Sequence, residues 1–244
     1  MDSPPLPDFS FNAAARIQGR YIGFERQPLL IIDDVLQHPE QMTQYAAAHG
    51  GFAAPLTGSY YPGLNGALPE GYGAALIGAL RPLLEKGFGV PRNAVLTYEG
   101  FFGLTTYAPE QLEPLQCIPH FDSSDPHRLA IVHYLCGAPY KGTAFFRHLP
   151  SGYESIGHAR FDLYRRRVEA ELAAESPVKA PVKAYVDETT PRYKQIDYVE
   201  AAFNRLAVYR TTSLHAAVMA GGELSADPAV GRLTANSFIQ VAPT

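Results

Sequence analysis

VLTYEGFFGLTTY, residues 95–107, is the stretch of this sequence that decides the fold. It is rich in β-branched and aromatic residues, which favour strands. Similar short runs follow at 117–122, 128–136, 143–148, 206–211 and 231–242, and turn signals such as GAPYKG at 137–142 separate them. Short strands divided by turns predict a mainly β protein with flanking helices, in the manner of a sandwich or jelly roll, and they disfavour alternating βα units.

The N-terminal part has a different character. Residues 28–34, PLLIIDD, predict a buried strand, and helices are expected at about 38–49 and 72–86, separated by a long loop at 52–70. We therefore expect residues 1–93 to form a strand and helices that pack on a core of residues 94–244. The two parts together would make one structural domain.

A polar insertion at about residues 158–204 interrupts the strands. Phe161, Tyr164, Val168 and Leu172 recur at helical spacing, which predicts an amphipathic helix laid on the domain. A short second helix is expected at 198–203. The first helix is either a solvated surface element, or a lid or oligomer contact beside a binding site.

Composition narrows the class of protein. The chain has 244 residues, 46% of them hydrophobic and 18% charged, which is typical of a globular protein. A net charge of -4 gives no reason to expect nucleic acid. No apolar run is long enough to cross a membrane, and the first residues do not resemble a signal peptide. Cys117 and Cys136 lack metal-site spacing and are expected to be buried reduced thiols, so a cytoplasmic location is predicted.

The run His120-Phe121-Asp122 carries the strongest chemical signal. A strand turns alternate side chains to one face, so His120 and Asp122 should project together and Phe121 should point away. With His215, which comes much later, these residues would make two imidazoles and one carboxylate. That is the facial ligand set of non-haem Fe(II) oxygenases, which leaves metal positions open.

The order of the surrounding motifs strengthens this signal. Tyr107-Ala108-Pro109 precedes the run, Leu214-His215-Ala216-Ala217 follows it, and Gly231-Arg232-Leu233-Thr234 comes last. Over about residues 97–238 the chain resembles the 2-oxoglutarate- and Fe(II)-dependent dioxygenases, in particular the prolyl-hydroxylase-like branch. The spacing from His215 to Arg232 is longer than prolyl hydroxylases usually have, and residues 221–228 fill it as a predicted loop.

The resemblance implies a double-stranded β-helix fold, the cupin-like jelly roll, and it implies roles for six residues. His120, Asp122 and His215 would bind Fe(II) and form the catalytic centre. Arg232 would pair with the distal carboxylate of 2-oxoglutarate, because its planar fork suits a carboxylate. Thr234 shares the strand face of Arg232 and could add a hydroxyl bond, and Tyr107 could line the co-substrate site. Either of these two could instead simply pack.

The resemblance further implies an oxygenase that consumes O2 and 2-oxoglutarate and releases succinate and CO2. An intact Asp122 favours hydroxylation, although desaturation and ring closure stay open. The substrate could be a small molecule, an amino acid or a peptide, and a homodimer is open. Two rivals stay open as well: a cupin-type metal enzyme that does not use 2-oxoglutarate, and a jelly-roll protein that binds a ligand without turnover. Arg232 and Thr234 argue against the first.

The remaining polar residues on strands have plainer interpretations. His127, His133 and His148 are expected to be hydrogen-bonded or surface residues and not metal ligands. His127, Arg128 and Arg147 flank the expected mouth of the site, so a role in substrate contact is open for them.

Overall fold

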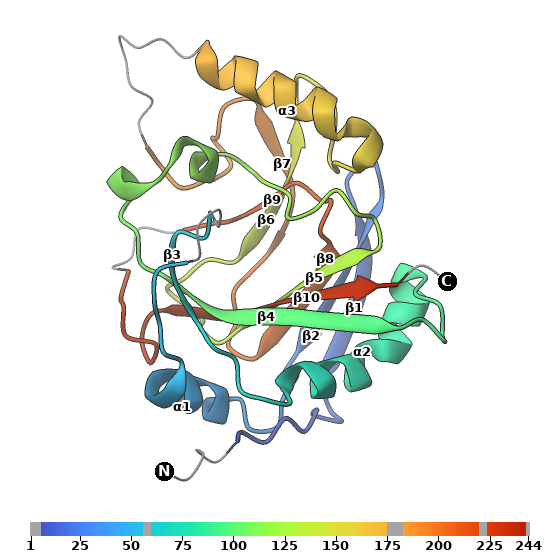
Figure 1. Cartoon of the computed structure of the whole chain (residues 1–244), viewed down its shortest axis with the longest axis vertical. Helices are drawn as coiled ribbons and strands as arrows, with labels where there is room; N and C mark the ends of the chain where they lie inside the picture. The colour runs from blue at the N-terminus through green and yellow to red at the C-terminus, as the bar shows by residue number, and fades with distance from the viewer. Residues whose placement is uncertain (1–5, 56–59, 175–182, 220–223, 243–244) are drawn as a thin grey trace.

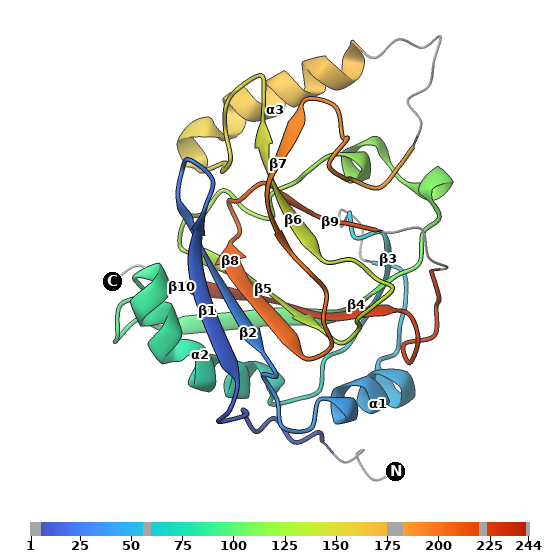
Figure 2. The ribbon, with the colours of Figure 1, turned by 180° about the vertical axis from the view of Figure 1, so that it is seen from behind.

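The computed structural model describes residues 6–55, 60–174, 183–219 and 224–242. These residues form two antiparallel sheets and three α-helices (Figures 1 and 2). The strands of the large sheet are β1 (Arg16–Ile22), β2 (Gln27–Asp33), β3 (Gly63–Gly66), β4 (Leu96–Thr105), β5 (Arg128–Tyr134), β8 (Arg205–Arg210) and β10 (Arg232–Val241). The small sheet comprises β6 (Thr143–His148), β7 (Tyr193–Val199) and β9 (His215–Ala217). The helices are α1 (Glu40–His49), α2 (Tyr72–Phe88) and α3 (His158–Ala173).

The large sheet has the strand order β1-β2-β8-β5-β10-β4-β3. β10 pairs along its length with β4 on one side and with β5 on the other, so the last strand of the chain lies inside the sheet. The small sheet has the order β7-β6-β9. An isolated bridge between His120 and His215 adds one further pairing beside β9.

The sheets and helices are stacked in layers. Side chains such as Ile31, Ala130, Phe145 and Tyr209 fill the space between the two sheets. Their sequence neighbours on the large sheet, such as Ile32 and Ile131, point the other way and pack under α1 and α2. Strands covered on both faces read as continuous apolar runs, which explains the pattern of residues 28–34.

The helices cover the outer faces of the two sheets. Met42 of α1 and Leu76, Leu80 and Leu84 of α2 are buried against the large sheet. Gly89 ends α2 in the left-handed conformation (φ 68°), with its N–H bonded to the carbonyl of Leu84, an arrangement that glycine adopts without steric cost. Tyr164 and Val168 of α3 pack on the outer face of the small sheet. None of the helices in the described part of the chain combines the length and apolar character that a bilayer crossing requires.

The mainly β fold with flanking helices is confirmed, and the predicted strands at 95–107, 128–136, 143–148, 206–211 and 231–242 match β4, β5, β6, β8 and β10. The expected strand at 117–122 is wrong. Residues Pro114–Cys117 form a 3₁₀ turn, and Pro119 has no N–H to give to a ladder, so only the bridge at His120 is made.

Two further expectations also need correction. The predicted helix at 198–203 is wrong, because Tyr198 and Val199 end strand β7, which pairs with β6. This polar segment is a strand because β6 offers it a ladder of main-chain hydrogen bonds. The predicted loop at 52–70 contains the short strand β3, which pairs with β4.

Candidate metal centre

The backbone brings the two histidines together. The N–H of His120 donates to the carbonyl of His215 at 2.9 Å, and the N–H of His215 donates to the carbonyl of His120 at 2.8 Å. The N–H of Asp122 donates to the carbonyl of Thr211 at 2.9 Å, just beyond the end of β8. These main-chain bonds fix residues 120–122 beside β9 without a full strand.

The three side chains converge as the alternation predicts. Nε2 of His120 lies 3.7 Å from Oδ1 of Asp122, and Nε2 of His215 lies 3.7 Å from Oδ2 of the same carboxylate. One nitrogen of each ring and a carboxylate oxygen all lie within 4.8 Å of one another. Phe121 points the other way, and its ring packs on Phe161 and Tyr164 of α3. The donor set therefore has the composition and convergence that a divalent metal needs.

A hydrogen bond orients the ring of His215. Its Nδ1 lies 2.9 Å from the carbonyl oxygen of Ser213, which can only accept, so Nδ1 carries the proton. Nε2 of the neutral ring then has a free lone pair directed toward Asp122. Metal-binding histidines are commonly fixed in this way by a bond from the other ring nitrogen.

The site is recessed but opens on one side. The side chain of His215 is 6% exposed, that of Asp122 20%, and that of His120 52%. Burial lowers the pKa of both His120 and His215 to about 4, and in His120 the charge of His215 lowers it further. Both rings are therefore neutral at pH 7, which is the form that binds a metal.

Asp122 has the opposite shift. Burial raises the pKa of its carboxyl to about 6, although the charge of His120 counteracts this. Among the described residues, no lysine or arginine forms an ion pair with Asp122. A recessed carboxylate without a cationic partner is costly, and a bound cation would offset that cost.

A second buried charge lies on β10. Arg232 is 3% exposed, and its Nε and Nη2 donate to the carbonyl oxygens of Lys141 and Gly142 at 3.2 and 3.3 Å. In the part of the chain that the structure describes, no carboxylate forms an ion pair with it. A buried guanidinium held only by neutral carbonyls is suited to receive an anion.

Tyrosines connect the two charged sites. The ring of Tyr209 lies 4.8 Å from that of His215. Burial raises the pKa of Tyr209 well above its usual value; the charge of Asp122 adds to this shift and that of Arg232 opposes it. Burial likewise raises the pKa of Tyr134 to about 12, against the effects of its 2.6 Å bond to Thr143 and of the charge of Arg232. Tyr209 thus lies where the fields of the triad and of Arg232 overlap.

Tyr61 was not singled out by the sequence. Its hydroxyl lies 3.2 Å from Oγ1 of Thr105, and burial raises its pKa, while Arg232 and a hydrogen bond with Thr234 lower it. Thr234 itself is buried and receives a bond from the amide of Asn236 at 3.0 Å. The structure therefore brings Arg232, Thr234 and Tyr61 together. The only hint in the sequence was the aromatic pair Tyr60-Tyr61 in a predicted loop.

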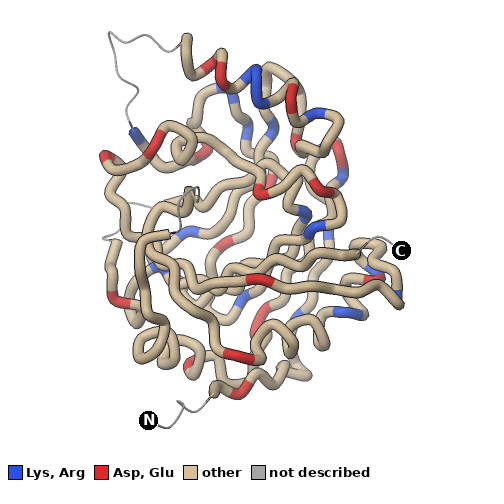
Figure 3. Tube along the Cα trace, viewed as in Figure 1, with Lys and Arg blue, Asp and Glu red and all other residues tan. Residues whose placement is uncertain are grey.

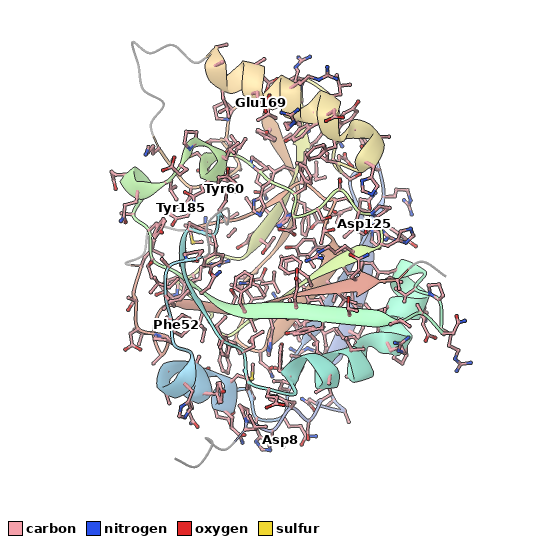
Figure 4. All side chains as sticks on the ribbon, viewed as in Figure 1. Asp8, Phe52, Tyr60, Asp125, Glu169 and Tyr185 are labelled. Atoms are coloured by element: carbon pink, nitrogen blue, oxygen red, sulfur yellow. The ribbon has the colours of Figure 1, made fainter. Side chains whose placement is uncertain are left out.

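The structure gives Tyr107 a different contact. Its main-chain carbonyl accepts a bond from the hydroxyl of Tyr185 at 2.7 Å, while its own ring is half-buried. The charge of Arg232 also acts on Tyr185, whose pKa burial raises. Tyr185 comes from the insertion and is labelled in Figure 4. The role of Tyr107 in binding a co-substrate stays a prediction.

Other polar residues are engaged elsewhere. His133 bonds Tyr72 and Asn204, and His148 bonds Ser151 and Glu171, so both are hydrogen-bonded as expected. Arg147 pairs with the buried Glu154, which commits it to a structural contact. Both cysteines are free thiols; Cys136 is buried and Cys117 only half-buried.

The sequence matches the family of unknown function DUF6445 over residues 13–239, which is most of its length. The chain belongs to this family. No curated protein matches it. The match to DUF6445 includes all three residues of the triad and Arg232.

Proposed function

We propose that this protein is an Fe(II)- and 2-oxoglutarate-dependent dioxygenase that hydroxylates a C–H bond. One observation carries the proposal: the two-histidine, one-carboxylate triad shares the interior between the sheets with a buried arginine that forms no ion pair among the described residues. A metal would complete the triad. A dicarboxylate with one end on that metal and the other on the arginine would complete both sites at once.

The order of the strands supports a jelly roll as the fold. From β4 onward the chain passes from the large sheet to the His120 bridge, back to β5, across to β6 and β7, back to β8, across to β9, and finally to β10. β4, β10, β5 and β8 are adjacent in the large sheet, opposite β7, β6, β9 and the bridge. Alternation of this kind between two facing antiparallel sheets is the pattern of a double-stranded β-helix.

Each residue has a defined task in this proposal. His120, Asp122 and His215 would hold the metal, which, when bound, supplies oxygen activation coupled to breakdown of the 2-oxo acid to succinate and CO2. Arg232 would bind the distal carboxylate of 2-oxoglutarate through its planar fork. Tyr61 would donate a hydroxyl bond to the same carboxylate, and so would Thr234 if its hydroxyl turned away from the carbonyl of Gly103, its acceptor at 3.4 Å. Tyr134 and Tyr209 would exclude water between the two sites.

Arg232 distinguishes this proposal from a metal enzyme of the cupin type without 2-oxoglutarate. Such an enzyme needs no buried cation near its metal, and an isolated buried guanidinium lowers stability unless something binds it. The intact triad likewise favours catalysis over simple ligand binding.

The test measures succinate formed from 2-oxoglutarate with Fe(II) and O2, with and without added substrates. We expect slow succinate formation without substrate, lost in His120→Ala and Asp122→Ala. His38→Ala is the matched control, because His38 is exposed and distant from the triad in the chain. Fe(II) binding that is lost in the triad variants but unaffected by 2-oxoglutarate would instead indicate the cupin-type enzyme. Absence of succinate in the iron-loaded wild type would refute the proposal.

A further inference from the structure

A second group of charged residues lies on the inward face of the large sheet, at the end away from Arg232. Phe238 on β10 pairs with Glu99 on β4 and with Ala130 on β5, and Ala130 pairs with Tyr209 on β8. Directly paired residues share one face of a sheet. Because Tyr209 contacts His215, the whole row, including Glu99 and Phe238, faces the interior that holds the triad.

Arg128 joins this row from the first residue of β5. Its guanidinium forms an ion pair with Glu99 and lies 5.1 Å from the ring centre of Phe238. Phe238 packs on the core between the sheets, which places the Arg128 head on the same inward face. Arg128, Glu99 and Phe238 are called the mouth cluster below.

The mouth cluster is near the triad. The N–H of Asp122 donates to Thr211, and the N–H of Thr211 donates to the carbonyl of Arg128 at 3.2 Å. Neighbouring strands lie about 4.8 Å apart, so the backbones of Arg128 and Asp122 are about 10 Å apart. In Figure 4, Asp125, which precedes β5, and Tyr185, near Arg232, lie on opposite sides of the molecule.

The cluster is also open to water. The side chain of Arg128 is 26% exposed and that of Glu99 is 63% exposed. An exposed ion pair contributes little to stability, so folding alone gives little reason for placing two charges on an inward sheet face. Figure 3 shows acidic and basic residues interspersed along the chain.

We propose that the mouth cluster binds the charged end of a free α-amino acid, the substrate whose side chain then reaches the metal. This inference rests on the proposed function. Arg128 would receive the carboxylate, Glu99 the ammonium, and Phe238 would pack against the carbon chain. The two charges of the zwitterion complement the two side chains.

The same pair discriminates against other ligands. A simple anion, including a second 2-oxoglutarate, would meet repulsion from Glu99, and a simple cation would meet repulsion from Arg128. The charged end of the amino acid would be held at the mouth cluster and its oxidised carbon must lie next to the triad, so its carbon chain must reach from one to the other.

The test uses the twenty common L-amino acids, with N-acetyl and amide forms of any that bind. Binding is measured by ligand-observed NMR on protein loaded with Zn(II) and 2-oxoglutarate, and turnover is measured separately as succinate release with Fe(II). The variants are Arg128→Gln and Glu99→Gln, and folding is checked by circular dichroism. Arg165→Gln and Glu169→Gln are matched controls, since this exposed pair lies on α3.

We expect at least one amino acid to bind and to stimulate succinate release. Arg128→Gln should weaken its binding about tenfold to hundredfold, and acetylation or amidation should do the same. Succinate release without substrate should be unchanged in the control variants Arg165→Gln and Glu169→Gln. In the double variant Glu99→Arg/Arg128→Glu an ion pair is kept but its direction is reversed, so binding should stay lost.

The outcomes separate the two proposals. If no amino acid binds, or if Arg128→Gln binds as well as wild type, the mouth cluster is not a substrate site, whatever the succinate result. If the double variant restores binding, the pair is merely structural and the inference is overturned. Binding that depends on Arg128, in a protein that forms no succinate, would support this inference while refuting the proposed function.

Discussion

His120 and His215 exchange two main-chain hydrogen bonds, 2.9 and 2.8 Å long, and their rings lie 4.4 Å apart. This short bridge holds one ligand-bearing segment against β9 in the small sheet. His120 and Asp122 otherwise lie on a segment outside the strands, so side chains packed beneath it add to the order that the main-chain bonds give.

Phe121 supplies that packing. Its ring contacts Phe161 and Tyr164 of α3, and we expect Phe121→Ala to lower the free energy of unfolding by about 2 kcal/mol. The looser segment should also weaken metal binding about tenfold, because ordering His120 and Asp122 would then oppose binding. Urea unfolding and Mn(II) titration measure the two effects. Leu163→Ala, at an exposed position of α3, is the control; metal affinity equal to wild type in Phe121→Ala would contradict this role.

Arg232 is expected to act on 2-oxoglutarate and not on the metal. Arg232→Ala should weaken 2-oxoglutarate binding about a hundredfold, because the loss of a buried charge partner costs several kcal/mol. Tyr61→Phe should cost about tenfold, since it removes a single hydroxyl. Calorimetry with the Zn(II)-loaded protein measures 2-oxoglutarate affinity, and Mn(II) titration measures metal affinity. A parallel loss of both affinities in Arg232→Ala would indicate a collapsed site and count against the assignment.

Local pattern was enough to predict β2, β4, β5, β8 and β10 of the large sheet and the convergence of the triad. β4 and β10 are long runs of β-branched and aromatic residues, and the pair His120 and Asp122 follows from two-residue alternation. The alternation remains valid at residues 120–122 even though no regular strand forms, because one bridge at His120 is enough to set the direction of the side chains.

Tertiary pairing determined what local pattern did not show. β7 lies in a polar insertion, and its strand form depends on the ladder that β6 offers. Tyr61 reaches Thr234 only because β3 pairs with β4, so that residues far apart in the sequence become neighbours. The mouth cluster likewise depends on the register of three strands, which the sequence does not reveal.

His133 should make the metal-free protein less stable as the pH falls. The amide of Asn204 donates to the carbonyl of Leu36, so its Oδ1 is the acceptor for His133 Nε2, and Nδ1 accepts from the hydroxyl of Tyr72. Burial lowers the pKa of His133 to about 4, below the value of 6.5 expected in the unfolded chain. As the pH falls, His133 therefore binds a proton in the unfolded state before it does so in the folded state. The stability that His133 contributes is complete above pH 6.5 and falls by up to about 3 kcal/mol as the pH approaches 4.

Urea unfolding with a chelator between pH 4 and 7.5 tests this. The pKa values of His120 and His215 are also lowered, so these residues change the stability with pH in the same direction as His133. The raised pKa of Asp122 changes it in the opposite direction. The comparison of wild type with His133→Gln isolates one residue. The variant should be less stable at pH 7.5. The slope of its unfolding free energy against pH should correspond to about one proton fewer taken up on unfolding. An unchanged pH dependence would show that His133 is not held neutral.

Glu171 should anchor α3 to the small sheet. The fully buried ring of His148 lies between Ser151 Oγ at 2.9 Å and Glu171 Oε2 at 3.0 Å, and Arg167 donates to the same carboxylate. Although burial opposes the shift, these hydrogen bonds hold the pKa of Glu171 below its usual value. Glu171→Ala would leave Nε2 of the buried His148 ring without a partner, so we expect a loss of about 2 kcal/mol and faster hydrogen exchange across His158–Ala173. Glu169→Ala, which removes an exposed pair on the same helix, should change stability by less than about 0.5 kcal/mol. Equal exchange rates in the two variants would mean that α3 is held by its apolar contacts alone.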